Sequence, residues 1–197
     1  MPILGAEPCS FPDDWLGEAS PWVLDADSER RWWAVYTKAR QEKALARQLY
    51  GQQISFYLPL VPNDHLLRGH RVRALMPLFQ GYVFLFGTAE ERVQSLTTNR
   101  ISRILPVSRQ DELGRELTQL RRLIALGIPL TAERRLAPGQ RVRIQKGSLA
   151  GLEGTVTQRR GGERLLIAIS YLQQGVSIEI NDFMVEAISP TPAQAGP

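Results

Sequence analysis

The chain has 197 residues, 43% of them hydrophobic, and a formal net charge of +4, which is typical of one or two folded domains rather than of a disordered protein. No apolar run approaches the roughly 18 residues of a membrane span, and the first residues lack the basic and apolar regions of a secretory signal. The single cysteine, Cys9, excludes an internal disulfide and a multi-thiolate metal site. We therefore expect a cytoplasmic protein with no membrane partner.

The net charge conceals a division along the chain. Residues 1–30 carry seven acids and one base, residues 31–127 carry fifteen bases and seven acids, and residues 128–197 carry eight bases and six acids. A basic middle segment favours an anionic partner. The open alternative is a basic surface that only keeps the protein soluble.

Residues 1–30 are predicted to be an acidic extension, disordered or loosely docked, and residues 31–127 have the pattern of an α+β domain. Aromatic and β-branched runs predict strands, and apolar residues at helical spacing predict helices. In chain order we expect a strand at 32–37, a helix at about 40–50, a strand at 54–60, a hairpin at 65–73, a strand at 80–86, a helix from 88 to 96 that opens with a capping box, a strand at 101–107 and a helix from about 113 to 127. This order indicates helices packed on a mainly antiparallel sheet.

The remaining residues read as a second, smaller domain. Prolines and charges at 128–136 predict a linker, and residues 190–197 have the composition of a disordered tail. Between them, residues 137–189 contain five short runs of strand-forming residues separated by glycine-rich turns. This spacing predicts a small closed β-barrel.

The run from Pro138 to Val156 has glycines at 147, 151 and 154, where a strand enters and leaves a loop. It closely resembles a KOW motif, and the resemblance implies an SH3-like barrel. A segment of this kind can also fold as a helical hairpin. Because this one is rich in Val, Ile and Thr, which favour strands, we expect it to be a β-barrel at all times. The open alternative is an unrelated five-stranded barrel with ordinary glycine turns.

Two further runs are Arg31-Trp-Trp-Ala-Val-Tyr-Thr-Lys-Ala-Arg40 and Pro77-Leu-Phe-Gln-Gly-Tyr-Val-Phe-Leu-Phe86. Ahead of a KOW motif, they resemble the NGN domain of the NusG/RfaH family of transcription factors. Gln80 stands where the family usually has proline. The hairpin tip and the residues around Thr37 and Leu78 are more similar to the specialised RfaH branch than to housekeeping NusG.

The resemblance implies that the NGN-like domain binds the clamp helices of RNA polymerase through an apolar patch. The matching positions are Tyr36, Tyr82, Phe84, Ile104 and Val107. Exposed aromatic side chains of this kind suit a helical partner. The open alternative is that Phe84 and Ile104 belong to the core.

The resemblance to RfaH also implies contact with the non-template single DNA strand through basic side chains. Lys38 matches such a position, and charge alone adds the nearby arginines Arg40, Arg68, Arg71, Arg73 and Arg100. Arginine and lysine contacts to phosphate, with aromatic stacking, suit a single strand. For each residue the alternative is a solvated basic face.

Three leucines of the KOW-like segment are candidates for partner binding. Leu149 and Leu152 lie in a loop where no strand periodicity requires them, and Leu172 lies near a turn. In NusG proteins the matching loops contact the ribosomal protein NusE or the termination factor Rho, which the resemblance implies here. The alternative for Leu152 is that it fills the end of the barrel.

No pattern for catalysis is present: the chain has two histidines, His65 and His70, and no phosphate-binding loop or nucleophile elbow. We therefore expect no enzymatic activity and no cofactor, and the resemblance implies a monomeric elongation or antitermination factor. The alternative is an RNA-binding ribosomal-type KOW protein. A weaker one is an enzyme with an unrecognised site.

Overall fold

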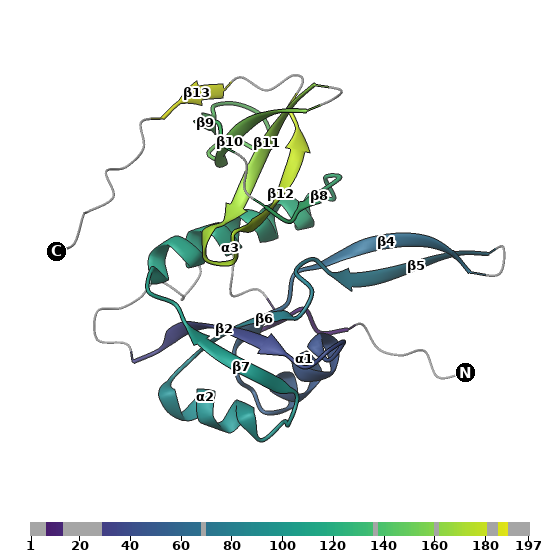
Figure 1. Ribbon diagram of the computed structural model, residues 1–197, viewed down its shortest axis with the longest axis vertical. Coiled ribbons are helices and arrows are strands. Elements are labelled where there is room, and N and C mark those ends of the chain that lie inside the picture. Colours follow the sequence, from purple (N-terminus) through teal and green to yellow (C-terminus); the bar gives the residue numbers. More distant parts are fainter. Residues whose placement is uncertain are drawn as a thin grey trace. The chain divides into compact units, whose positions relative to one another are not determined.

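The computed structural model describes residues 7–13, 29–67, 70–135, 138–159, 162–180 and 185–188 (Figure 1). The chain divides into two compact units, Met1–Thr118 (unit 1) and Gln119–Pro197 (unit 2), and helix α3 (Gln110–Ala125) contributes residues to both. None of the helices in the described ranges is long and apolar enough to cross a membrane.

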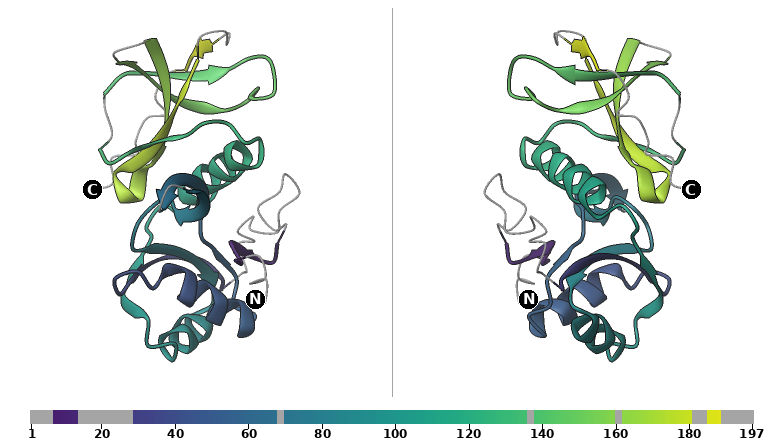
Figure 2. Two further views of the ribbon diagram at one scale, coloured as in Figure 1. Left: turned by 90° about the vertical axis from the view of Figure 1, so that its right-hand side faces the viewer. Right: turned by 90° about the vertical axis from the view of Figure 1, so that its left-hand side faces the viewer.

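Unit 1 is built on a five-stranded sheet in which every neighbouring pair is antiparallel. Its outermost strand, purple in Figure 2, comes from the acidic extension. Part of the segment predicted to be disordered or loosely docked is therefore a strand of the sheet. In spatial order the strands are β1 (Ser10–Phe11), β3 (Phe56–Tyr57), β6 (Tyr82–Gly87), β2 (Arg31–Thr37) and β7 (Ile101–Pro106).

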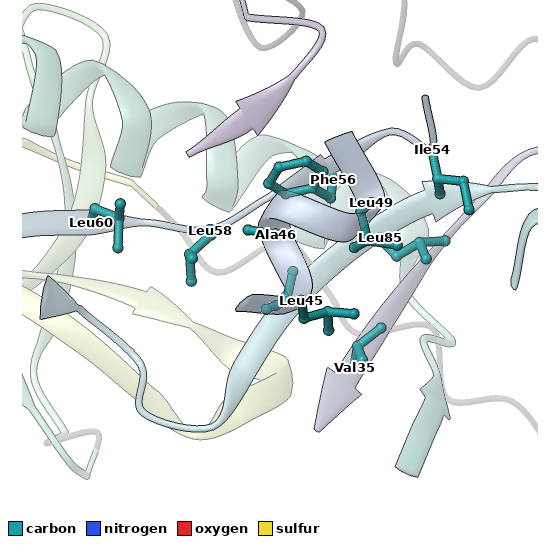
Figure 3. Close-up of a cluster of buried hydrophobic side chains, with 10 residues drawn as sticks. Val35, Leu45, Ala46, Leu49, Ile54, Phe56, Leu58, Leu60 and Leu85 are labelled. Carbon is teal, nitrogen blue, oxygen red and sulfur yellow. The ribbon is translucent and has the colours of Figure 1, made fainter. Parts of the chain in front are cut away.

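One face of this sheet packs against helix α1 (Glu42–Gly51). Leu45 and Leu49 recur at helical spacing, so both side chains face the sheet. There they meet Val35 and Leu85 from the two central strands in a fully buried cluster (Figure 3).

Helix α2 (Ala89–Leu96) lies against the same face. Thr88 and Glu91 form the predicted capping box at its start. The Arg92 guanidinium stacks on Trp33, 5.2 Å from the ring centroid, and Trp33 also packs against the α1 cluster. Trp33 therefore lies on the helix-covered face, whereas Trp32 and Tyr36 of β2 lie on the other face, opposite Phe86 and Tyr82 of β6.

Strands β4 (Leu60–Leu67) and β5 (His70–Pro77) form a separate two-stranded antiparallel sheet, paired from Leu60 opposite Pro77 to Leu67 opposite His70. The predicted hairpin is therefore present and is longer than the sequence pattern indicated. The side chains of residues 64–73 lie outside the described part of the chain.

Unit 2 contains a six-stranded antiparallel sheet around a core of branched aliphatic side chains such as Leu165, Ile167 and Ile178. A 3-10 turn at Ser170–Leu172 joins β11 to β12. In spatial order the strands are β13 (Val185–Ala187), β9 (Gln140–Ile144), β10 (Glu153–Arg159), β11 (Gly162–Ile169), β12 (Gln174–Glu179) and β8 (Thr131–Glu133).

The predicted fold class, an antiparallel α+β domain followed by a small β-rich domain, is confirmed. The stretch predicted as a linker contains β8, which pairs with β12. Arg164 donates a 2.8 Å hydrogen bond to Thr131, and Ser177 donates a 2.7 Å hydrogen bond to Glu133, so this strand is held by side chains as well. The sequence pattern gave no sign of this pairing, because a three-residue polar strand at a sheet edge is too short to show alternation.

Candidate functional site

The exposed aromatic feature of unit 1 is the pair Tyr36 and Tyr82, which we call the tyrosine pair. The two residues lie directly opposite each other on β2 and β6, with ring centroids 5.2 Å apart. Tyr36 is 42% exposed, and Tyr82 is partly exposed. Residues directly opposite in an antiparallel pair share a face, so the tyrosine pair lies on the face away from α1 and α2.

The β-turn Phe79–Tyr82 holds the tyrosine pair in position. The Tyr82 amide donates to the Phe79 carbonyl at 3.1 Å, and Gly81 at the third position has a φ of +82°. A Cβ atom on Gly81 would lie 2.8 Å from the Tyr36 ring, so both the backbone and the space require glycine here. Gln80 occupies the position where proline is common in such turns.

Glu42 connects this turn to the helical layer. Its buried carboxylate accepts a 2.7 Å hydrogen bond from the Gly81 amide, and the Gly81 carbonyl accepts a 2.8 Å hydrogen bond from the Thr37 amide. Glu42 lies in the first turn of α1, where a negative charge is favoured by the helix dipole. The sequence analysis did not select Glu42, although an acid at the start of a predicted helix was visible.

The other predicted patch residues do not join the tyrosine pair. Phe84 is 0% exposed and packs edge-on against Phe79, with centroids 6.3 Å apart, so it belongs to the core. Ile104 lies opposite Val35 and packs against the α1 cluster, on the other face of the sheet. Val107 follows β7 and is buried. These placements correct the expectation of a five-residue surface patch. Phe84 shares the face of Tyr82 but is buried against Phe79, whereas Ile104 lies on the opposite face of the sheet.

Arg103 is a residue that the sequence analysis missed. It lies opposite Tyr36 on β7, on the same face, and its side chain is exposed. A basic side chain next to an exposed tyrosine suits an anionic partner with flat, stacking groups. The proximity of Arg103 to Tyr36 could have been predicted by pairing the expected strand at 101–107 with the expected strand at 32–37.

Three of the predicted nucleic-acid residues come together where β2 ends and β7 begins. Lys38 and Arg40 are exposed, and the Lys38 ammonium donates to the Asn99 side-chain oxygen at 2.7 Å. Arg100 is partly buried and donates to the side chains of Gln48, at 3.0 Å, and Gln41. Arg100 therefore joins β7 to α1, whereas the other two are available to a ligand.

The remaining predicted basic residues belong to the β4–β5 hairpin. Arg71 lies opposite Leu66 and Arg73 lies opposite Asp64, with side chains outside the described part of the chain. Arg68, predicted to lie at the hairpin tip, is outside the described residues. Among the strand pairings described, none joins this hairpin to the five-stranded sheet.

In unit 2 the loop between β9 and β10 is held by the second half of α3. Arg122 donates to the Ser148 carbonyl at 2.7 Å and to the Ala150 carbonyl at 2.9 Å, and Gln119 accepts a 2.8 Å hydrogen bond from the Glu153 amide. The Glu153 carboxylate also raises the pKa of Arg143 through a hydrogen bond and its charge.

Leu149 and Leu152, predicted to form an exposed edge, are buried within this loop, whereas Leu172 in the 3-10 turn is partly exposed. The lack of strand periodicity does not place Leu149 and Leu152 at the surface, because the loop that carries them folds back on itself. The Gly151 amide donates to the Ile144 carbonyl at 2.8 Å.

The described residues contain no cluster of three His, Cys, Asp or Glu side chains that could hold a metal ion. Both exposed features, the tyrosine pair and the neighbouring basic residues, are suited to binding a macromolecule.

The sequence and the fold were compared with those of known proteins. Residues 30–122 match the family model described as "Transcription termination factor nusG". The matched segment contains both residues of the tyrosine pair, every basic residue predicted to bind nucleic acid, and Arg103, and it covers a little less than half of the chain. No curated protein matches the chain.

The chain also matches a chain of the solved structure "Crystal Structure of MjSpt4:Spt5 complex conformation B". The match covers 81% of this chain and 99% of that chain. The two are 15% identical and the TM-score is 0.24, so this similarity carries no functional conclusion.

We predict that Gly81→Ala lowers the free energy of unfolding by about 1–3 kcal/mol, because alanine is strained at this φ and its methyl group meets the Tyr36 ring. Gly127→Ala is the matched control: Gly127 also has a positive φ, +66°, but open space around it. Urea unfolding of both variants should give the larger loss for Gly81→Ala. Equal losses would mean that the Tyr36 ring is not held against the turn.

We predict that Arg122→Ala lowers the stability of unit 2 by about 1–2 kcal/mol, because two loop carbonyls lose a charged donor. Amide resonances of residues 148–152 should shift in the NMR spectrum. The control is Arg115→Ala, an exposed arginine of α3 whose side chain donates only to the helix backbone at Asp111. Shifts of the loop in both variants would assign the effect to helix propensity instead.

Proposed function

We propose that this protein is a non-enzymatic transcription elongation factor that binds RNA polymerase through unit 1. The observation that carries the proposal is the tyrosine pair, exposed on a domain whose sequence matches the NusG family model. In that family the equivalent domain binds the clamp helices of the polymerase, and the same contact is proposed here.

The chemistry of the tyrosine pair supports a helical protein partner. Each ring offers a large apolar surface at a low cost in conformational entropy, and its hydroxyl group remains hydrogen-bonded to water or to the partner. The turn at Gly81 and the carboxylate of Glu42 hold the rings before binding, so little order has to be created in the complex. Buried aromatic residues of this kind commonly carry most of the binding energy of an interface.

A second proposed contact is to the non-template DNA strand, through Lys38, Arg40 and Arg103. All three side chains are exposed, and Arg103 lies beside Tyr36 on the same face. A phosphate backbone bound by these residues would pass close to an aromatic ring, as in many proteins that bind single strands. Arg68, Arg71 and Arg73 of the hairpin remain candidates for the same strand.

Unit 2 is proposed to recruit a partner, either NusE or Rho, as the KOW domains of the family do. Of the three candidate leucines only Leu172 is partly exposed, so the proposed contact is centred on the 3-10 turn Ser170–Leu172. An antitermination role and a specialised, RfaH-like set of targets belong to this proposal as well.

The competing function is that of an RNA-binding ribosomal-type protein. It would use the basic residues of unit 1 and unit 2 and would not need exposed tyrosines. The two functions differ in the effect of removing the tyrosine pair, which should abolish polymerase binding in the first case and leave RNA binding nearly unchanged in the second.

We predict that Tyr36→Ala combined with Tyr82→Ala weakens binding to core RNA polymerase by well over tenfold, because two aromatic side chains contribute about 2 kcal/mol each. Tyr50→Ala is the matched control, since Tyr50 is similarly exposed, at 45%, but lies on α1. Circular dichroism should show all variants folded. Full polymerase binding by a folded double variant would contradict the proposed contact.

We predict that Lys38→Ala, Arg40→Ala and Arg103→Ala together reduce affinity for single-stranded DNA. The slope of log affinity against log salt should fall by up to about 0.7 for each lost phosphate contact. The control is Arg109→Ala, whose side chain is exposed and paired with Glu112 at 3.1 Å. If the triple variant keeps the salt dependence of the unaltered protein, these three residues do not contact phosphate.

A further inference from the structure

The outer edge of the unit 1 sheet is occupied by a segment of the acidic extension. Strand β1 pairs with β3, with Ser10 opposite Tyr57 and Phe11 opposite Phe56. The Leu58 amide donates a 2.7 Å hydrogen bond to the Cys9 carbonyl, which continues the pairing beyond the strand. Without this segment the Leu58 amide would lose its partner beside the apolar cluster.

Two side chains of the same segment, Phe11 and Glu7, contact helix α1. The Phe11 ring meets the Tyr50 ring edge-on, with centroids 5.4 Å apart, and also packs against the buried cluster. Four residues earlier, both carboxylate oxygens of Glu7 accept hydrogen bonds from the Arg47 guanidinium, at 2.8 and 2.7 Å. The edge of β3 and the exposed side of α1 thus contact the backbone, an aromatic ring and a carboxylate of one extended segment.

We propose that the edge of β3, with Arg47 and Tyr50 of α1, is a peptide-binding site for an extended segment carrying a carboxylate four residues before an aromatic ring, and that residues 7–13 of this chain are its ligand. Strand addition supplies affinity through the main chain, and the two side-chain contacts supply specificity. The site is separate from the tyrosine pair, which lies on β2 and β6, so the inference does not rest on the proposed function.

Charge and tethering both favour binding within the chain. The extension, residues 1–30, has seven acids and one base, and the residues after it carry an excess of bases. Fifteen residues separate Asp13 from Glu29. Because residues 7–13 are covalently joined to unit 1, their binding is intramolecular, so even a weak intrinsic affinity keeps the site filled.

The test follows hydrogen exchange of the Leu58 amide by NMR in the full chain. Phe11→Ala should speed exchange by about tenfold or more, because the ring contact and its buried area are lost. Arg47→Glu should speed exchange by about fivefold, and adding Glu7→Arg should restore the slow rate by reversing the ion pair. Glu29→Ala, which also removes one acid of the extension, is the matched control and should leave the rate unchanged.

A synthetic peptide of residues 7–13, added in excess to the Phe11→Ala chain, should slow Leu58 exchange again, and the same peptide with Phe11→Ala should not. Unchanged exchange in Phe11→Ala and Arg47→Glu, or failure of the charge reversal and of the peptide to restore protection, would overturn the proposal. Polymerase binding by the Phe11→Ala and Arg47→Glu variants is an independent measurement and should be unchanged. A loss of polymerase binding would indicate a disturbed tyrosine pair instead.

Discussion

The hydrogen bond from the Gly81 amide to the Glu42 carboxylate is the interaction on which the proposed polymerase contact depends. A single acceptor at the start of α1 holds the turn between Phe79 and Tyr82, and the Gly81 carbonyl holds the end of β2. The Tyr36 ring lies over the glycine, and a Cβ atom at position 81 would lie only 2.8 Å from it. A buried acceptor with a backbone donor is costly to leave unpaired, so the turn has few alternative conformations.

The sequence predicted the fold well wherever the signal was local. Residues 32–37, rich in aromatic and β-branched side chains, form strand β2 as predicted. Thr88 and Glu91 define the start of α2, and Leu45 and Leu49 lie on the predicted helix face. Each of these features depends on residues within one or two turns of one another. The glycine-rich turns of the second domain are local in the same sense, which is why the fold class could be predicted.

The candidate site was harder to predict because it depends on pairing between distant strands. Tyr36 and Tyr82, predicted to lie in one patch, are neighbours in the structure. Phe84 is instead buried against Phe79, and Ile104 lies on the opposite face of the sheet. Register also brings Arg103 beside Tyr36, which no local pattern indicates. Leu149 and Leu152 illustrate the same limit, because their burial depends on a loop that folds back toward β9 and on Arg122 from α3.

The most direct test of the account is crosslinking from the tyrosine pair. A photoreactive phenylalanine analogue at position 36, in the full chain, should crosslink to the clamp helices of RNA polymerase in a transcribing complex. The same analogue at position 50, on α1, should give no crosslink to that element. A crosslink from position 36 only to ribosomal RNA or to a ribosomal protein, or no crosslink in a complex that contains the protein, would contradict the account.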